Sequence, residues 1–412
     1  MFRFFKMVLC LLLAALTICA AGCGTEEKKE SSAAVHETKP PVQATTVAPT
    51  TQPATTVPRS ATSDSVSPDE GNVTYNGMDI KKNVNEIETT LDNLINTQKF
   101  MGSVYVKIGN DFEYIKAKGF ANQGAHLDNS IYRSSYAGSL TKLFTATAVM
   151  KLAEEKKLSL DDTLDKFFSG CAYGKEVTVR QLLTMTSGIP NYLTRGDAQG
   201  SGITPVKDLA AKLNEGSSYE KNKATILNWI LSQPRKADKE NTFAFSDSNY
   251  YLLGEIIGSA AQVPYETYLE EQIFKPTLMN KTGFEADETT ARPYDSAEAT
   301  APLFYEAVGY SSMGVITNVS DVLKFIDALS SRQLIGEKAL KEMTTDAGSG
   351  YGCGAYISGD RVSCSGEIDA YSVKLSFTLD KRLIFAAMSN YASSDPSLLH
   401  RVFSNYLSKY RN

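Results

Sequence analysis

The longest run of helix-periodic apolar positions in the chain begins at Ser139. In the segment SLTKLFTATAVMKLAEEKKLSL, the residues Leu140, Phe144, Ala148 and Leu152 recur at four-residue steps, and a second apolar row runs beside them. Two adjoining apolar rows cover much of the circumference of a helix. The pattern therefore predicts a helix that begins at Ser139 and is buried on much of its surface.

Shorter amphipathic runs predict further helices on both sides of this one. The run TVRQLLTMTSGIPNY opens with Thr178 and Gln181, which have the spacing of a capping box, and ends at Gly188 and Pro190. It predicts a short helix followed by a turn. The other predicted helices lie around residues 84–100, 223–233, 250–261, 321–331 and 397–410.

Strand-like alternation of apolar and polar residues appears at both ends of the predicted globular part. The runs that fit strands are residues 102–110, 112–122, 351–358, 361–366, 371–380 and 382–390. Strands at both ends with helices between them predict an α+β fold. We expect one antiparallel sheet built from N- and C-terminal segments and flanked by helices, with an inserted, mainly helical subdomain.

The N-terminal residues differ from the rest in composition. A basic start, an apolar run and the tetrad AAGC, which resembles the lipobox of bacterial lipoproteins, predict a signal peptide over residues 1–22 and lipid modification of Cys23. Cleavage at an unmodified site is the alternative. Residues 23–75 are rich in Thr, Pro and Ser, so we predict a flexible tether before a domain over residues 76–412. The domain is then expected outside the bacterial cell membrane, held by a lipid anchor.

Charge and metal-ligand spacing exclude several function classes. The formal net charge of −5 disfavours nucleic acid as a partner. The histidines His36, His126 and His400 lie far apart, and no cysteine spacing fits a metal site, so we predict neither a metal nor another cofactor. A Ser-His-Asp triad is also disfavoured. His126 and His400 are expected at the surface.

Ser139 and Lys142 are the candidate nucleophile and base. A hydroxyl at the N-terminal end of a helix lies where the helix dipole and the free N–H groups favour a developing anion. Lys142, three residues later, projects toward the same face. A second Ser-x-x-Lys, at Ser218 and Lys221, lies in a polar run and is expected to be an exposed loop or helix end.

Several blocks of the sequence are similar to a known family. YAGSLTKLFTATAVMKLAEEKKLSLDDTL, TVRQLLTMTSGIPNY, FAFSDSNYYLLGEII, SSMGVITNVSDVLKF and RLIFAAMSN follow the order and spacing of the penicillin-binding serine hydrolases, which include class C β-lactamases and D-alanyl-D-alanine carboxypeptidases. The resemblance covers the chain from about residue 85 to the C-terminus. It implies that Ser139 forms an acyl intermediate and that Lys142 is its base or proton relay.

The second motif of that family, Tyr-x-Asn, falls on Phe245, Ser246 and Asp247. Phe245 lacks the phenol that would carry a proton to the leaving group, while Asp247 can pair with Lys142 but cannot donate a hydrogen bond as an amide would. A shifted register, in which Ser246 takes the place of the tyrosine, is the alternative. Ser246 or Asp247 can also cap the helix that follows.

The third motif, Lys-Thr-Gly or His-x-Gly, falls on Cys364, Ser365 and Gly366, so a thiol replaces the substrate-binding cation. Gly366 permits close backbone approach, and the N–H groups of Glu367 and Ser139 could then form an oxyanion hole.

Two cysteines lie in the predicted hairpin of residues 351–366. A two-residue turn at Ser358 and Gly359 would place Cys353 opposite Cys364, close enough for a disulfide in an exported protein. Two reduced cysteines are the alternative. A disulfide would leave Cys171 as the free thiol, and the affinity of the site for free carboxylates should then be weak.

Two functions from different classes follow from these observations. The first is a cell-envelope serine hydrolase or acyl-transferase that acts on a peptide, ester or β-lactam carbonyl, with peptidoglycan as one candidate substrate. The second is a catalytically impaired member of the family that binds peptidoglycan or a protein partner. The intact Ser139 and Lys142 pair favours the first function, and Phe245 and Cys364 favour the second.

Overall fold

The structure is a computed structural model, and it describes residues 74–75, 78–195, 203–214, 216–236, 241–295 and 306–408. The predicted signal peptide, the lipidation site Cys23 and nearly all of the tether lie outside the described residues. These features and the predicted domain boundaries therefore stay predictions.

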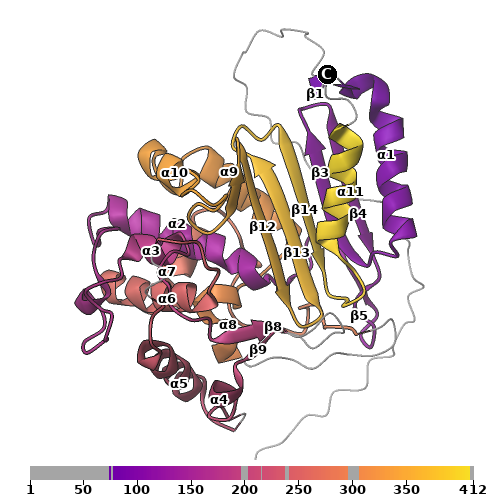
Figure 1. The fold of residues 1–412 in the computed structure, drawn as a ribbon. Coiled ribbons are helices and arrows are strands. Elements are labelled where there is room, and N and C mark those ends of the chain that lie inside the picture. The colour runs from indigo at the N-terminus through magenta and orange to yellow at the C-terminus, as the bar shows by residue number, and fades with distance from the viewer. Residues whose placement is uncertain are drawn as a thin grey trace, which may run out of the picture. The chain divides into compact units, whose positions relative to one another are not determined.

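A six-stranded antiparallel sheet, in the order β11-β12-β13-β14-β3-β4, forms the centre of the fold (Figure 1). The C-terminal strand β14 pairs with the N-terminal strand β3, so the two ends of the domain share one sheet. This confirms the predicted α+β class and the sheet built from both chain ends. The strands are β3 (Gly102–Ile108), β4 (Phe112–Lys118), β11 (Tyr356–Ser358), β12 (Arg361–Ile368), β13 (Tyr371–Thr378) and β14 (Leu383–Ser389).

Two helices, α1 (Ile80–Thr97) and α11 (Pro396–Ser408), lie side by side on one face of the sheet (Figure 1). Each buries an apolar stripe at helical spacing, for example Ile87 and Leu91 in α1 and Leu399 and Phe403 in α11. These side chains form one core with the strands that they cover. A second, larger core lies on the opposite face, between the sheet and the inserted helices.

The inserted part is mainly helical, as predicted. Its helices are α2 (Thr141–Glu154), α3 (Val179–Leu183), α4 (Lys207–Ala210), α5 (Tyr219–Ser232), α6 (Asp247–Ala261), α7 (Tyr265–Leu269), α8 (Glu306–Met313), α9 (Val319–Ser330) and α10 (Glu337–Met343). Short two-strand pairs join β1 (Thr74–Tyr75) to β2 (Met78–Asp79), β5 (Phe120–Asn122) to β6 (Leu127–Asp128), β7 (Ser135–Tyr136) to β10 (Ile316–Thr317) and β8 (Leu193–Arg195) to β9 (Ile203–Pro205). None of the helices in the described part of the chain has the length and apolar character needed to cross a membrane.

Helix α2 runs through the middle of the molecule and is buried on most sides, as its apolar rows predict. The helix proper begins two residues after Ser139, because residues 138–140 form a 3-10 turn. Gly138 opens this turn with a φ of 51°, a left-handed conformation that glycine adopts without strain. The predicted capping box of Thr178 and Gln181 at the start of α3 is confirmed.

The predicted hairpin register around the cysteines is wrong. The structure pairs Ile357 with Val362 and Ser358 with Arg361, so the turn lies one residue later than predicted. Cys353 and Cys364 are both unbonded, and the predicted disulfide between them is absent from the structure. Residues 351–355 do not continue the strand, because Gly352 N donates a hydrogen bond to Ala355 O and closes a tight turn there.

Candidate active site

Lys142 joins the three parts of the candidate site. Its ammonium donates hydrogen bonds to Ser139 Oγ at 3.0 Å, to Asp247 Oδ1 at 2.6 Å and to the main-chain oxygen of Ser312 at 3.0 Å. The side chain of Lys142 is only 1% exposed and that of Asp247 4%. Three acceptors match the three donors of an ammonium group, so the resting site holds a fully bonded, buried lysine next to the serine hydroxyl.

Asp247 lies at the start of α6, where an anion is favoured by the helix dipole. Its second carboxylate oxygen accepts a hydrogen bond from Asn191 Nδ2 at 3.1 Å, and its main-chain N–H donates to Asn191 Oδ1 at 2.9 Å. Asn191 therefore fixes the carboxylate that faces Lys142. The sequence analysis did not predict a role for Asn191. The one feature of the sequence that points to it is its position after Pro190, in the turn that follows α3.

The structure places the second motif in the register that the family spacing predicts. Asp247 contacts Lys142, and the ring centroid of Phe245 lies 5.3 Å from Lys142 Nζ. Ser246 Oγ is buried and has no hydrogen-bond partner, while Ser246 N donates to the thioether of Met185. The shifted register, and with it a catalytic role for Ser246, stays a prediction. Ser246 is also not a side-chain cap of α6.

Ser139 and the third motif lie against each other through their main chains. A Cβ atom added to Gly366 would lie 2.7 Å from Ser139 N and 2.5 Å from Ala137 O, and one added to Gly138 would lie 3.0 Å from Glu367 N. Only glycines permit this approach, because larger residues would collide with the opposite backbone. The N–H groups of Ser139 and Glu367 thus lie on adjoining segments, which is the arrangement that an oxyanion hole requires.

Cys364 lies on the same face of β12 as Gly366, and its thiol donates to Gly354 O. Burial raises the pKa of the Cys364 thiol to about 12, so it is neutral at physiological pH. The thiol therefore supplies no charge where the family has a cation. Burial also raises the pKa of Cys353 to about 12.

The second Ser-x-x-Lys, at Ser218 and Lys221, lies at a helix end, as predicted. Ser218 precedes α5, and its hydroxyl accepts a hydrogen bond from Lys221 N, which is an ordinary helix cap. The lysine side chain is not the partner in this bond. Among the described residues, no three His, Cys, Asp or Glu side chains gather as a metal site.

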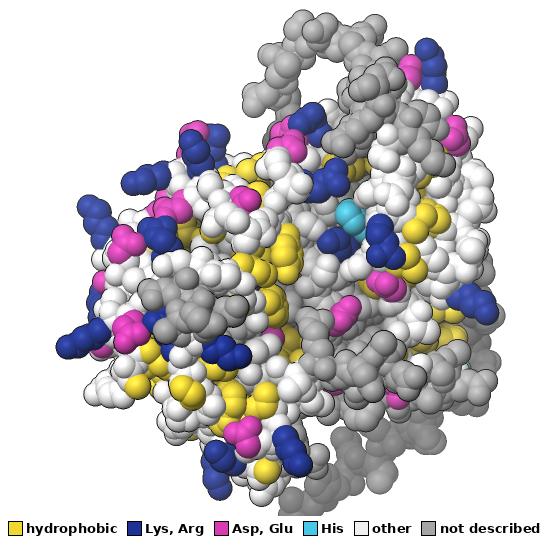
Figure 2. Space-filling model, viewed as in Figure 1, with side chains coloured by type: hydrophobic (Ala, Val, Ile, Leu, Met, Phe, Trp, Pro, Cys, Tyr) yellow, Lys and Arg dark blue, Asp and Glu magenta, His cyan; other side chains and the backbone are white. Residues whose placement is uncertain are grey.

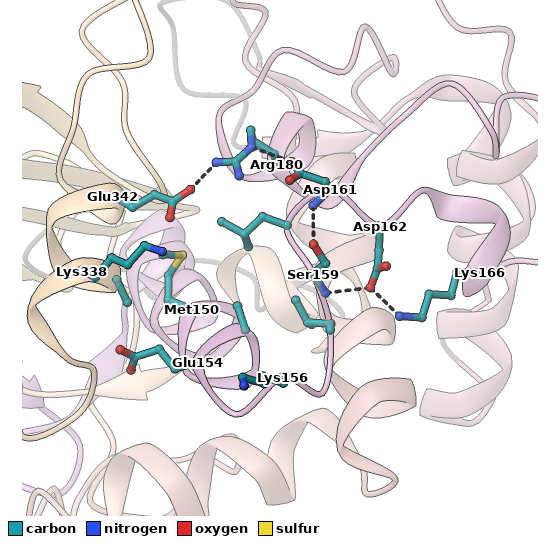
Figure 3. A pocket seen from close by; sticks show the side chains of 14 residues that line it. Met150, Glu154, Lys156, Ser159, Asp161, Asp162, Lys166, Arg180, Lys338 and Glu342 are labelled. Atoms are coloured by element: carbon teal, nitrogen blue, oxygen red, sulfur yellow. Dashed lines mark hydrogen bonds and ion pairs between the residues drawn. The ribbon is translucent and has the colours of Figure 1, made fainter.

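A cavity of about 610 Å³ lies away from Ser139, beside the C-terminal end of α2 (Figure 3). Five of its charged side chains pair with one another: Arg180 contacts both Glu342 and Asp161, and Lys166 contacts Asp162. Because these charges are already compensated within the protein, the cavity offers no free charge to a ligand through these pairs. We therefore place the candidate active site at Ser139.

The comparison with protein families decides the assignment. A family model described as Beta-lactamase matches residues 124–402, a range that contains Ser139, Lys142, Asp247 and Gly366. The chain belongs to this beta-lactamase family. The family consists of serine hydrolases, and the Ser139 and Lys142 pair lies within the matched range.

Individual relatives agree with this assignment. A Bacillus subtilis (strain 168) protein named as a penicillin-binding protein, PbpX, is 27% identical over 323 residues, which cover 75% of this chain and 77% of its own. The crystal structure of a penicillin binding protein from Bacillus halodurans has a TM-score of 0.65 at 22% identity and covers 77% of this chain and 98% of its own. D-amino acid amidase from Ochrobactrum anthropi SV3 has a TM-score of 0.63 at 18% identity, with 79% and 98% covered. At these identities the two structures show a shared fold alone.

Replacing Gly366 by alanine tests the arrangement around Ser139. The added methyl group would collide with Ala137 O and Ser139 N, so the β12 main chain must move away from the serine. We expect the rate of Ser139 acylation to fall by about a hundredfold in Gly366→Ala, which is typical for the loss of an oxyanion-hole donor. The measurement is time-resolved labelling with a fluorescent fluorophosphonate.

Gly283→Ala is the matched control, because nothing lies within 4 Å of a Cβ added at Gly283. It should label at the wild-type rate. A wild-type rate in Gly366→Ala itself would contradict the assigned oxyanion hole.

Proposed function

We propose that this protein is a serine hydrolase or acyl-transferase of the cell envelope that works through an acyl-Ser139 intermediate. Its substrate would carry a peptide, ester or β-lactam carbonyl, and the names of its penicillin-binding and D-amino acid amidase relatives support substrates of this kind. The observation that carries the proposal is Lys142 Nζ, which contacts Ser139 Oγ and Asp247 Oδ1 at once. A serine without a base is a weak nucleophile, and this contact supplies one.

The geometry suggests how the serine is activated. As Ser139 Oγ bonds to the substrate carbonyl carbon, its proton passes to Lys142 Nζ, and Lys142 gives one of its own protons to Asp247 Oδ1 at 2.6 Å. The net movement is one proton from the serine to the aspartate. An asparagine at this position could accept a hydrogen bond but not the proton, so Asp247 gives the site a proton acceptor.

The same groups act in reverse when the intermediate collapses. The bond to the leaving group breaks, the leaving group takes a proton from Lys142, and Asp247 returns its proton to Lys142. Water or another acceptor then attacks the acyl group by the same route. Phe245 lies beside Lys142 without a hydroxyl, so the leaving group has no phenol to protonate it, and we expect poor leaving groups to react slowly.

We also propose that the domain is extracytoplasmic and lipid-anchored to the cell membrane. The apolar run that ends in AAGC supports cleavage before Cys23 and its lipid modification, and the Thr/Pro/Ser-rich residues 23–75 support a tether. Such a placement would bring Ser139 to peptidoglycan or other envelope substrates.

An impaired family member that binds peptidoglycan or a protein partner is the second candidate function. Phe245 and the neutral Cys364 favour it, because both replace groups with chemical roles in the family. The bonded Lys142, Ser139 and Asp247 favour the enzyme, because a binding module has no need of a buried charge next to a serine.

Ser139→Ala and Lys142→Ala separate the two candidates. In the enzyme, Ser139→Ala abolishes covalent labelling by a fluorescent penicillin and hydrolysis of a nitrophenyl ester. Lys142→Ala loses about a hundredfold to ten-thousandfold in rate, the usual contribution of a general base. Labelling that persists without Ser139 would identify a different nucleophile, and unreactive wild-type protein that still binds peptidoglycan would favour the binding module.

Asp247→Asn tests the proton acceptor. We expect acylation to slow by about a hundredfold or more, because the amide cannot take the proton from Lys142. Asp321→Asn is the matched control, since Asp321 is another buried aspartate bonded to a lysine, Lys324, outside the site. Acylation of Asp247→Asn at or above the wild-type rate would show that the carboxylate only positions Lys142.

Phe245→Tyr tests whether the missing phenol limits turnover. We expect turnover of an amide or peptide substrate to rise about tenfold or more, because its amine leaving group needs a proton, whereas a nitrophenyl ester should respond little. Phe243→Tyr, a nearby aromatic position packed on Tyr351, is the control and should change neither rate. An amide rate that is unchanged or lower in Phe245→Tyr would contradict this account of Phe245.

A further inference from the structure

The outer face of the sheet, opposite to the face that meets Ser139, carries a cluster of cationic and hydroxyl groups. Lys374 of β13 lies directly opposite Ser365 of β12. Its ammonium donates hydrogen bonds to Ser363 Oγ at 2.6 Å and to Ser365 Oγ at 3.2 Å. Successive residues of a strand point to opposite faces, so these three side chains share the face that packs against α11, whereas Gly366 faces Ser139.

Lys374 has no carboxylate partner in the part of the chain that the structure describes. Its side chain is partly buried. Burial and the nearby charge of Arg361 lower the pKa of Lys374. A cation that has lost part of its hydration is usually paired with an anion, so one that is bonded to hydroxyl groups alone indicates a place for an anionic ligand.

The positive charge of this cluster also acts on His400 of α11. Burial, and after it the charges of Lys374 and Arg361, lower the pKa of His400 to about 3, so the imidazole is neutral at physiological pH. His400 is partly buried, where the sequence predicted a surface residue. Figure 2 shows Lys and Arg side chains around a histidine on the sheet side of the molecule. A positive potential that keeps a histidine uncharged would stabilise a bound anion.

A buried hydroxyl group lies on the same face of the sheet. Ser376 follows Lys374 by two residues on β13 and lies directly opposite Ser363 of β12. Its side chain is fully buried, and its Oγ has no hydrogen-bond partner among the described residues. Buried hydroxyl groups nearly always have a partner, so this one is an available donor at the floor of the cluster.

The cluster therefore offers several hydrogen-bond donors to one ligand. Lys374 uses two of its three N–H groups on Ser363 and Ser365. Ser365 Oγ accepts hydrogen bonds from Lys374 and, at 3.4 Å, from Ser397 Oγ, so its own hydrogen can donate. The hydroxyl of Ser376 adds a third donor. A phosphate group presents at least three acceptor oxygens and more charge than a carboxylate, so it suits this set better.

We propose that Lys374, Ser365 and Ser376 form a binding site for a phosphate group on the outer face of the sheet. The ligand class is inorganic phosphate or a phosphate monoester, either soluble or at the headgroup of a lipid. Ser365 is exposed, which gives such a ligand access from solvent. The inference goes beyond the proposed function, because the site lies across the sheet from Ser139 and takes no part in acyl transfer.

Calorimetric titration of the full-length protein with inorganic phosphate, at an ionic strength held constant with sodium chloride, tests the site. Wild-type protein should bind one phosphate per chain. Lys374→Met should weaken this binding by at least about tenfold, as expected for the loss of a charge-assisted hydrogen bond. Ser376→Ala removes only the buried hydroxyl and should weaken it by about threefold to tenfold. Lys374→Arg keeps the charge and should keep measurable binding.

Lys116→Met is the matched control, because Lys116 is a lysine of β4, at the other edge of the sheet. It should bind phosphate as the wild-type protein does, and so should Ser139→Ala. Loss of binding in Ser139→Ala would place the phosphate in the active site and overturn the inference. Absence of saturable binding to wild-type protein, or equal losses in Lys374→Met and Lys116→Met, would also overturn it.

Two further probes identify the source of the phosphate group. Glycerol 3-phosphate is soluble, and phosphatidic acid, carried in phosphatidylcholine vesicles, presents the same phosphate monoester at a lipid surface. Binding of glycerol 3-phosphate without sedimentation on the vesicles would identify a soluble ligand. Sedimentation that is lost in both Lys374→Met and Ser376→Ala would identify a lipid headgroup. Sedimentation that falls equally in Lys116→Met would show attraction by general charge and would contradict a defined site.

Discussion

The buried charge of Lys142 is the constraint on which the rest of the site depends. An ammonium removed from water needs compensating partners, and here they come from three separate segments: Ser139 before α2, Asp247 at the start of α6 and the main chain of Ser312 in α8. If one of these segments moved, the lysine would lose an acceptor that water cannot easily replace. The same contacts that stabilise the charge therefore hold the serine, its base and the aspartate in one place.

The sheet supplies the other half of the site, and close backbone packing positions it. Gly366 brings β12 against the turn that carries Ser139, so the oxyanion donors depend on the absence of a side chain. Around this frame, two groups of the family motifs are missing, because Phe245 has no hydroxyl and Cys364 has no charge. Asp247 still places a carboxylate beside Lys142.

Local signals in the sequence were enough to predict the fold class, the helix after Ser139 and the capping box at Thr178, because each depends on periodicity or on residues a few positions apart. The pairing of the hairpin at Cys364 was mispredicted by a turn placed one residue early, and any such slip changes which residues face each other. The contact of Asn191 with Asp247 is made between distant segments. It becomes visible only when the turn after α3 and the start of α6 are placed next to each other.

The account is tested most directly by identifying the residue that carries the acyl group. Wild-type protein would be treated with a fluorescent penicillin or a fluorophosphonate, digested and mapped by mass spectrometry. We predict one adduct, on the peptide that contains Ser139, and none on the peptide of Ser218, whose hydroxyl only caps a helix. An adduct on any other residue, or no adduct with either reagent, would contradict the claim that Lys142 prepares Ser139 for acyl transfer.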